Sequence, residues 1–408
     1  MNRTRTSLRP VLAGLLMTLA QLFVAVVLIA PEGPLPWRYT TLVQHDSYWF
    51  ANIVDRGYAT TVPPSAHKMM EVSNVAFFPA YPAIAGALRY GLNLSTYDAL
   101  LITAQMAAWA FWSYFFLFCE RWNIAPLLRF FGALAIVAHP TAFFLVAGYS
   151  ESLFMTALFG FMYWSGSDGR VAKILAVLHG FTMSATRIVG VACAAFPVVR
   201  AVFKKGFVAL RDVHAWARNY AGAVGIMLGA MLGAGTFFIY CLLRWGRWDI
   251  YMITQHLGWA IVPDYLAVFK GASYRWLVPQ LKDPTSASQM TMTLAAVLFG
   301  VVALCEVIPA IRRQTAWSTR VGFYFCAALI YYVSVSGVAC VEMESMLRYE
   351  FCVHALIVLA IVHFLHQLRT PPMWVRALGM ATVALLSAAS LIVQGWYVWN
   401  FTRGGWVA

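Results

Sequence analysis

A carboxylate and a group of aromatic side chains stand together near the start of this 408-residue chain. Asp46 follows His45, and Tyr48, Trp49 and Phe50 come shortly after it. An ionised aspartate within hydrogen-bond reach of a hydroxyl can act as a general base. The alternatives are a solvated loop carboxylate or the N-cap of a short helix. In so apolar a chain a carboxylate at a membrane surface needs a specific reason, and base chemistry is one.

The elements that must position this carboxylate are membrane helices. Hydrophobic residues make up 61% of the chain and charged residues 11%, against about 25% charged residues in soluble domains. Long continuous apolar runs do not fit the alternating pattern of a β-barrel, and helices then remain as the way to pair every backbone group in lipid. We predict an all-α polytopic protein with about ten to eleven transmembrane or half-membrane helices in a single domain, residues 1–408. The net charge of +13 is attributed to basic cytoplasmic loops and not to a nucleic-acid surface.

The order of apolar and basic segments predicts a topology. Arg3, Arg5 and Arg9 precede the first apolar run and favour a cytoplasmic N-terminus. The predicted spans are 11–30, 97–118, 127–146, 153–164, 220–243, 290–308, 321–338, 351–364 and 375–399. Two large outer loops fall at about 31–82 and 244–289. The near-helical spacing of aromatic residues in the first of them predicts a short helix on the membrane surface.

One apolar run, between Lys173 and the basic cluster at 200–205, is interrupted by Thr186 and Arg187. A single span would place the second cluster outside, against the positive-inside bias. Two half-helices that enter and return satisfy both ends and put Arg187 at the tip, near the outer face. Broken membrane helices occur where they line a polar cavity. A guanidinium there matches phosphate geometry, and the alternative is a topogenic or snorkelling arginine.

The polar residues that could carry chemistry fall on the outer face in this topology. They are His45, Asp46, Asp55, His67, Glu71, Asn74, Tyr149, Glu151, Arg187, Gln255, His256, Arg348 and Tyr349. A lipid or solute transporter is the alternative from another functional class. It would place its ionisable groups near the midplane between repeated halves, and the sequence has no repeat.

Each of these residues also has a plainer explanation. Ser150 and Glu151 can cap the helix that they open. Arg348 can pair with the acids near it in sequence, which are Glu342, Glu344 and Glu350. The histidines show no compact metal-ligand spacing, so we expect no metal.

A set of motifs runs in order from Asp46 to Tyr349. They are Asp46, Trp49-Phe50, Ile53 and Gly57-Tyr58; Asn74, Ala76-Phe77-Phe78-Pro79 and Pro82; Pro140, Phe144, Gly148-Tyr149-Ser150-Glu151 and Leu153-Phe154; Thr186-Arg187 with Gly190; and, more weakly, Gln255 with Trp259 and Arg348-Tyr349. By these motifs the chain resembles the PIG-V type mannosyltransferases, which add the second mannose in glycosylphosphatidylinositol (GPI) anchor synthesis, and their bacterial relatives. These belong to the GT-C class of membrane glycosyltransferases. The family commonly has a tryptophan before the aspartate, where this chain has His45.

The resemblance implies an activity and a set of site residues. Mannose would pass, with inversion, from polyprenyl- or dolichyl-phosphate mannose to a hydroxyl of a glycolipid or other acceptor on the extracytoplasmic or lumenal face. Asp46 would be the catalytic base, and Arg187 and Arg348 would bind the donor phosphate. The substrate-binding residues would be His45, Trp49, Asn74, Tyr81, Tyr149, Glu151, Gln255, His256 and Tyr349. No metal or other cofactor is implied.

Two points stay open at this level. The alternative among enzymes is a GT-C transferase that uses another polyprenyl-phosphate sugar. The chain is short for a eukaryotic member, which favours a bacterial plasma membrane over the endoplasmic reticulum, and since bacteria generally lack GPI the acceptor is open. The prediction on which the rest depends is geometric: Asp46 and Arg187 must meet at the non-cytosolic mouth of one lipid-accessible cavity.

Overall fold

The computed structural model describes residues 8–59, 73–206, 212–275, 284–309, 316–343, 345–368 and 372–407. Every regular element in these ranges is a helix, so the predicted all-α class is confirmed. Within them, seven helices are long and apolar enough to cross a membrane, as expected of a multi-pass membrane protein. They are α1 (Arg9–Leu22) continued by the π-helical η1 (Phe23–Ile29), α5 (Thr96–Arg121), α11 (Val213–Trp245), α13 (Pro284–Val307), α15 (Trp317–Val338), α16 (Met346–Gln367) and α17 (Met373–Phe401).

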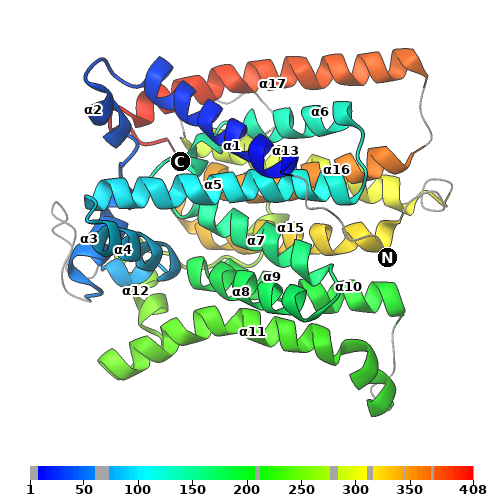
Figure 1. Cartoon of the computed structure of the whole chain (residues 1–408), viewed down its shortest axis with the longest axis horizontal. Coiled ribbons are helices and arrows are strands. Elements are labelled where there is room, and N and C mark those ends of the chain that lie inside the picture. Colours follow the sequence, from blue (N-terminus) through cyan, green and yellow to red (C-terminus); the bar gives the residue numbers. More distant parts are fainter. Residues whose placement is uncertain are drawn as a thin grey trace.

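Shorter helices complete the bundle. Those inside it are α6 (Pro126–Val137), α7 (Glu151–Ser165), α8 (Arg170–Thr186), α9 (Val189–Cys193) and α10 (Phe196–Lys205). Those gathered at one end, on the left in Figure 1, are α2 (Leu35–Thr40), α3 (Asp46–Arg56), α4 (Ala80–Leu92) and α12 (Ile250–Trp259). The α3 helix is the short helix predicted in the first loop. The count of ten to eleven membrane segments stays a prediction, because several of these helices are too short to span alone.

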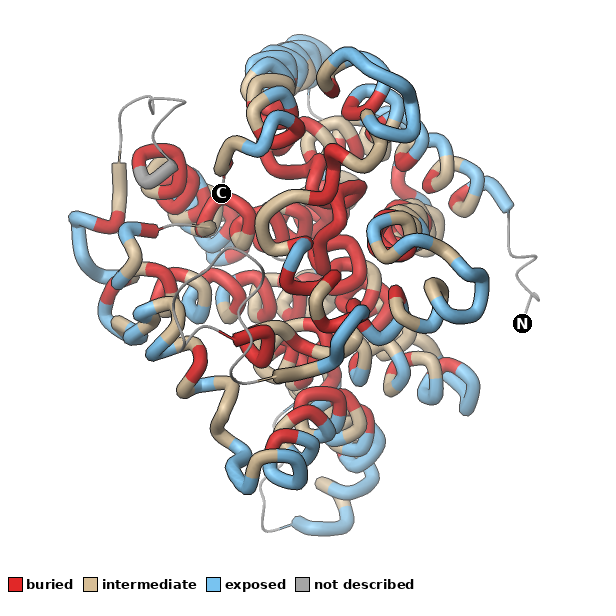
Figure 2. The backbone as a smooth tube through the Cα atoms, turned by 90° about the vertical axis from the view of Figure 1, so that its left-hand side faces the viewer, coloured by how far each residue is buried: buried red, intermediate tan, exposed pale blue. Residues whose placement is uncertain are grey.

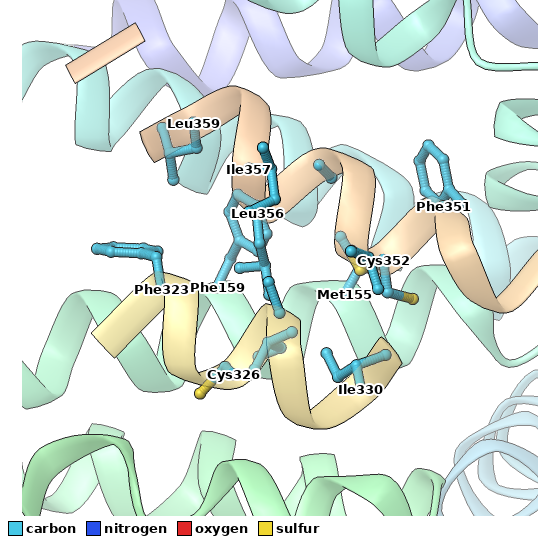
Figure 3. Close-up of a cluster of buried hydrophobic side chains, with 14 of the residues drawn as sticks. Met155, Phe159, Phe323, Cys326, Ile330, Phe351, Cys352, Leu356, Ile357 and Leu359 are labelled. Atoms are coloured by element: carbon cyan, nitrogen blue, oxygen red, sulfur yellow. The ribbon is translucent and has the colours of Figure 1, made fainter. Parts of the chain in front are cut away.

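The helix α16 forms the centre of the bundle. In its most apolar stretch 72% of residues are buried, against 11% in α17, which lies along one outer edge. The end-on view shows the same gradient, with buried backbone in the middle and exposed helices around it (Figure 2). Figure 3 shows how α7 and α15 pack on α16 through side chains such as Phe159, Cys326 and Leu356. The exposed apolar faces outside this core suit a lipid surround.

The predicted span 127–146 is wrong in its second half. The helix α6 ends at Val137, and the chain continues without regular helix except for a short 3₁₀ turn. The cause is Pro140, which lacks a backbone N–H and disfavours helix at the residue before it. Gln394 donates from Nε2 to the carbonyls of Val137 and His139, at 2.9 and 2.5 Å. Such backbone is tolerated at membrane depth because the protein itself pairs its polar groups.

The interrupted run behaves as predicted, but its first arm is longer than half a membrane. The helix α8 has 17 residues, which corresponds to roughly 25 Å. It ends at Thr186, Arg187 is extended, and α9 and α10 lead back. Gly190 allows this close turn, because a Cβ there would lie 2.6 Å from the Met183 carbonyl oxygen.

The two ends of the bundle differ in charge. Where α5, α7 and α10 end, Arg121 donates to the carbonyl of Tyr163 and Arg200 to that of Ser165, at 2.7 and 3.2 Å. We call this the basic end; its other basic residues include Arg129, Arg170, Lys173, Lys204 and Lys205. The opposite end, which holds α3 and α12, is called the cavity end for the feature described next.

Candidate functional site

Four charged side chains from four helices form one chain of contacts at the cavity end. Arg348 donates from Nη1 to Asp46 Oδ2 at 2.7 Å, and its Nε lies 3.3 Å from Glu151 Oε1. Arg187 donates from Nη2 to the same Glu151 oxygen at 3.0 Å. Asp46 and Arg348 are 302 positions apart in sequence. The charges thus alternate in the order Asp46, Arg348, Glu151, Arg187.

Each of these four side chains lies at or directly beside the end of a helix, and these helix ends meet at the cavity end of the bundle. Asp46 is the first residue of α3, Glu151 the first of α7, and Arg348 lies in the first turn of α16. Arg187 directly follows the last residue of α8. Gly148 lets the loop before α7 approach α3, since its N–H donates to the Leu42 carbonyl at 3.0 Å and a Cβ would lie 3.1 Å from Ser47 Oγ.

The plainer explanations for these residues do not account for their contacts. The N-cap position of α3 is held by His45, so Asp46 is not the N-cap. Ser150 at the start of α7 makes no capping hydrogen bond through its side chain. Glu151 is 1% exposed, and its Oε2 has no hydrogen-bond partner among the described residues. A buried carboxylate with spare acceptor capacity between two arginines indicates a built polar site.

Aromatic rings support the two guanidinium groups. The Arg187 guanidinium lies 4.8 Å from the Tyr349 ring centre, and that of Arg348 lies 5.1 Å from the Tyr149 ring centre. Cation–π contacts of this kind hold a guanidinium in place while leaving its N–H donors available. The backbone N–H of Asp46 donates to the Tyr149 hydroxyl at 3.3 Å. Burial, followed by the nearby Asp46 carboxylate, raises the pKa of Tyr149 well above its usual value, so the phenol stays protonated.

These groups line a cavity of about 1040 Å³. A second part of its wall is aromatic: Trp49 stacks on Phe77 with ring centres 5.8 Å apart, and Trp259 lies 5.4 Å from Trp49. A third part belongs to α15, from Ile330 to Val338, and is mainly apolar, with Ser334 and Ser336 among its residues. The cavity therefore combines a charged corner, an aromatic wall and an apolar side, and its size fits a small organic ligand.

Most of the predicted site residues meet at this cavity. Those on its lining are His45, Asp46, Trp49, Tyr149, Glu151, Arg187, Gln255, His256, Arg348 and Tyr349. Asp46 and Arg187 share one cavity, and the non-cytosolic, lipid-accessible position of its mouth stays a prediction. His67, Glu71 and Glu344 lie outside the described residues.

Asn74 and Tyr81 are placed differently from the prediction. Asn74 is fully buried and donates from Nδ2 to Asn52 Oδ1 and to the Gly57 carbonyl, at 2.7 and 2.9 Å. Tyr81 is fully buried and donates to the Leu100 carbonyl at 2.8 Å. Neither is on the cavity lining. Their side chains tie the first loop to itself and α4 to α5, so we no longer expect them to touch substrate.

His45 connects the site to the end of the chain. Its backbone has a positive φ of 49°, and its Nε2 lies 3.1 Å from the Gly405 carbonyl oxygen. Because a carbonyl only accepts, Nε2 carries the proton in this contact. The His45 ring also meets Trp406 edge-on at 4.9 Å.

Some lining residues were not foreseen. Tyr48, Tyr251, Ser345 and Trp406 all border the cavity. Tyr251 is the second residue of α12, a helix that lies inside the predicted loop 244–289. Trp406 belongs to the C-terminal segment that contacts His45 from 360 positions away, through Gly405. No spacing rule links such positions. Among the described residues no group of three or more histidine, cysteine, aspartate or glutamate side chains is placed to hold a metal.

No protein-family model matches the chain, and no curated protein matches it. Solved structures do match its fold. ArnT from Cupriavidus metallidurans, solved bound to undecaprenyl phosphate, superposes with a TM-score of 0.53 at 14% identity, over 98% of this chain and 76% of ArnT. The arabinofuranosyltransferase AftD from Mycobacteria gives 0.51 at 16% identity, over 96% of this chain and 27% of AftD. The Archaeoglobus fulgidus oligosaccharyltransferase tethered to an acceptor peptide gives 0.50 at 11%, over 99% and 56%.

These likenesses concern the fold, because the identities are low. The narrower resemblance to the PIG-V type family stays a prediction. The three neighbours are glycosyltransferases of the GT-C fold class, and the chain has the fold of these membrane proteins.

Proposed function

We propose that the protein is an inverting membrane glycosyltransferase that moves mannose from polyprenyl- or dolichyl-phosphate mannose to a hydroxyl of a glycolipid or other acceptor. The observation that carries the proposal is the 2.7 Å contact of Asp46 with Arg348 on the wall of one large cavity that Arg187 also lines. The transfer needs a carboxylate to take a proton and cations to hold a phosphate. The likeness to ArnT, which was solved with undecaprenyl phosphate, supports a lipid-phosphate substrate.

Arg187 and Arg348 act as the phosphate clamp in this proposal. The four charges of the site cancel, with Asp46 and Glu151 opposite the two arginines. A donor phosphodiester brings one negative charge, and its leaving group gains a second as the sugar departs. Guanidinium groups fixed where that charge develops stabilise the transition state more than the ground state.

Arg348 also links donor binding to the base. Its Nη1 donates a hydrogen bond to Asp46 Oδ2. A donor phosphate competes with Asp46 for this guanidinium, because both are anionic acceptors of the same donor group. Donor binding then leaves the Asp46 oxygen available to the acceptor hydroxyl. Donor binding in this proposal therefore frees the base by taking over its arginine partner.

The reaction balances with these residues alone. The acceptor oxygen attacks the anomeric carbon while Asp46 takes the hydroxyl proton. The bond between the anomeric carbon and the phosphate oxygen breaks, and its electron pair stays on that oxygen. Polyprenyl phosphate leaves on the arginine side, and the configuration at the anomeric carbon inverts. The protonated carboxyl is then deprotonated by solvent.

The rest of the cavity fits the remaining parts of the substrates. The rings of Trp49, Phe77 and Trp259 offer apolar faces of a size that suits a hexose. The α15 side, with Ile330, Val333 and Val338, offers an apolar wall for the isoprenoid tail. Mannose itself is supported by the motif resemblance only, so a GT-C transferase that uses another polyprenyl-phosphate sugar is the second candidate.

The charge difference between the two ends supports an extracytoplasmic site. Among the described residues basic side chains occur at both ends, but most carboxylates lie at the cavity end, so the excess positive charge is at the opposite end, which the positive-inside rule assigns to the cytoplasm. At the cavity end several basic side chains are neutralised, as in the pairs Arg89–Asp55, Arg247–Asp249 and Lys270–Asp264. We therefore propose that the protein is a multi-pass protein of a bacterial plasma membrane, with the cavity on the extracytoplasmic side.

The test compares two aspartates on the same helix. The full chain is reconstituted with decaprenyl-phosphate mannose and the lipid extract of a strain that lacks the protein, and released decaprenyl phosphate and new mannolipids are followed by mass spectrometry. We expect Asp46→Asn to lower transfer by about 10²–10⁴-fold, the range for losing a general base. Asp55→Asn, which alters an aspartate nine residues further along α3 in the surface pair with Arg89, should match the unaltered protein. Near-normal transfer by the Asp46→Asn variant would contradict the role of Asp46 as the base. Equal use of decaprenyl-phosphate glucose would contradict specificity for mannose.

A further inference from the structure

A second cavity, of about 620 Å³, lies at the same end of the bundle and shares no lining residue with the first. It lies between the end of η1, the helix α2 and the end of α17. Its lining residues are Leu28, Ile29, Ala30, Glu32, Arg38, Gly395, Trp399 and Arg403.

Two arginines converge on one turn of backbone in this cavity. Arg38 donates from Nη2 to the carbonyls of Val27 and Ala30, at 2.7 and 3.1 Å. Arg403 donates from Nη1 to the carbonyls of Ile29 and Trp399, at 3.4 and 3.0 Å. Because these acceptors include residues 27, 29 and 30, the two guanidinium groups sit at the same helix end.

Capping of the helix end accounts for only some of the N–H donors of each arginine. Cations at a helix C-terminus satisfy its free carbonyls and its dipole. A guanidinium has five N–H donors, and capping engages a single nitrogen of each of these two groups. Arg38 Nε is buried and has no hydrogen-bond partner within the described part of the chain. The geometry therefore leaves donors unused at a site where two cations meet.

The charge of this cavity is unbalanced. Neither Arg38 nor Arg403 is in an ion pair with a carboxylate of the described residues, whereas Arg89, Arg247 and Lys270 at the same end are. The one acid on the lining is Glu32, which is exposed. Two guanidinium groups facing one carboxylate leave a net positive charge for an anion.

The surroundings of the cavity are those of a lipid-facing surface. Two long apolar helices border it, α1 with η1 and α17. In their most apolar stretches only 28% and 11% of residues are buried, and among the long apolar helices only α13 is comparable. Leu28 and Trp399 are 63% and 48% exposed, and the Arg403 guanidinium lies 4.5 Å from the Trp399 ring centre. Tryptophan favours the membrane interface, and basic pockets between membrane helices bind anionic headgroups.

We propose that this cavity binds the phosphate of an anionic phospholipid. Arg38 and Arg403 hold the phosphate oxygens through their unused N–H donors, and the acyl chains lie along the apolar surface at Leu28 and Trp399. The site is independent of the glycosyl-transfer cavity and does not rest on the function proposed for it.

Native mass spectrometry of the full chain tests this site. The protein in detergent is mixed with dioleoyl phosphatidylglycerol, with dioleoyl phosphatidylcholine, or with inorganic phosphate. We expect phosphatidylglycerol to be retained at least about fivefold better than phosphatidylcholine. Arg403→Gln should remove that preference, and Arg403→Lys should keep part of it because the charge stays. Lys270→Gln, which removes a cation elsewhere at the same end, is the matched control.

Each outcome decides the proposal. Loss of the preference in Arg403→Gln together with its survival in Lys270→Gln supports the site. Equal retention of the two lipids, or an unchanged preference in Arg403→Gln, overturns it. Displacement of phosphatidylglycerol by millimolar inorganic phosphate would assign the site to free phosphate and overturn the lipid. If Arg403→Gln fails to fold, Arg38→Lys decides the question, because it keeps the charge and loses the planar fork: lowered phosphatidylglycerol retention supports the site, and unchanged retention overturns it.

Discussion

The two ends of α16 each carry a buried arginine–glutamate cluster, and the two clusters differ in what surrounds them. At the cavity end Arg348 lies between Asp46 and Glu151. At the basic end Arg320 donates from Nε to Glu306 at 2.7 Å and from Nη1 to Gln367, near the end of α16, at 2.9 Å. The Arg320 side chain is fully buried and that of Arg348 is 4% exposed. Burial and charge alone therefore do not separate them.

The difference lies in access and in partners. The first cluster lines a cavity of about 1040 Å³, and neither of the two cavities includes Arg320 or Glu306. The partners in the first cluster come from α3, from α7 and from the extended residue after α8, so the cluster depends on chain segments that meet at one point. The second joins neighbouring helices α13, α15 and α16. A buried ion pair within a packed bundle fixes helices, whereas one that opens to a cavity can exchange its partner for a ligand.

Within this comparison of the two clusters, the largest expected effect comes from exchanging the two arginines for glutamine one at a time. We expect Arg348→Gln to lower transfer per folded molecule by about 10²–10³-fold, the range for removing a charge-stabilising donor. Arg320→Gln should leave that turnover unchanged and instead destabilise the fold by about 3–5 kcal/mol, because it strands a buried Glu306. Transfer assays normalised to the monodisperse fraction, with thermal unfolding in detergent, separate the two. An equal fall in normalised turnover for both variants would refute the distinction.

The matched pair of glutamates sharpens the same contrast. Glu151 contacts both Arg187 and Arg348 through Oε1, so Glu151→Gln should loosen the clamp. We expect a rise of roughly tenfold in the KM for the donor, which corresponds to about 1.4 kcal/mol of lost positioning. Glu306→Gln at the basic end should leave the donor KM as it is. A donor titration of both variants checks this, and an unchanged KM in Glu151→Gln would show that Glu151 does not position the arginines.

Much of this arrangement could be predicted from the sequence, because the chemistry sits in local motifs. The presence of a short helix after Asp46 follows from aromatic spacing, and the break at Thr186 and Arg187 follows from charge and apolar patterning. Gly190 belongs to the same motif, and its close approach to Met183 gives that motif a physical reason. Local sequence patterns are therefore enough to place Asp46 and Arg187 near helix ends.

Contacts across the chain could not be predicted in this way. Nothing near Arg348 in sequence indicates Asp46 as its partner, and the nearby acids Glu342 and Glu350 were the simpler expectation. Glu350 instead contacts His139 Nε2 at 2.7 Å, on the other side of α16 from the cavity lining. The fold of the helices decides which acid is reached, and single-sequence patterns carry no such information.

The smallest expected effect concerns a residue that the sequence placed in the substrate site. The Tyr81 hydroxyl donates to the Leu100 carbonyl at 2.8 Å and is away from the cavity lining. Tyr81→Phe removes that one buried hydrogen bond, which should destabilise the protein by about 1 kcal/mol. Turnover and donor KM should stay within twofold of the unaltered protein. The phenyl ring keeps the packing against α3, so the free energy of positioning Asp46 should change by no more than a few tenths of a kcal/mol, which corresponds to less than a twofold change. Thermal unfolding and a donor titration measure the two quantities. A large rise in donor KM without a loss of stability would return Tyr81 to the substrate site and would mean that the cavity extends behind α4 when the donor binds.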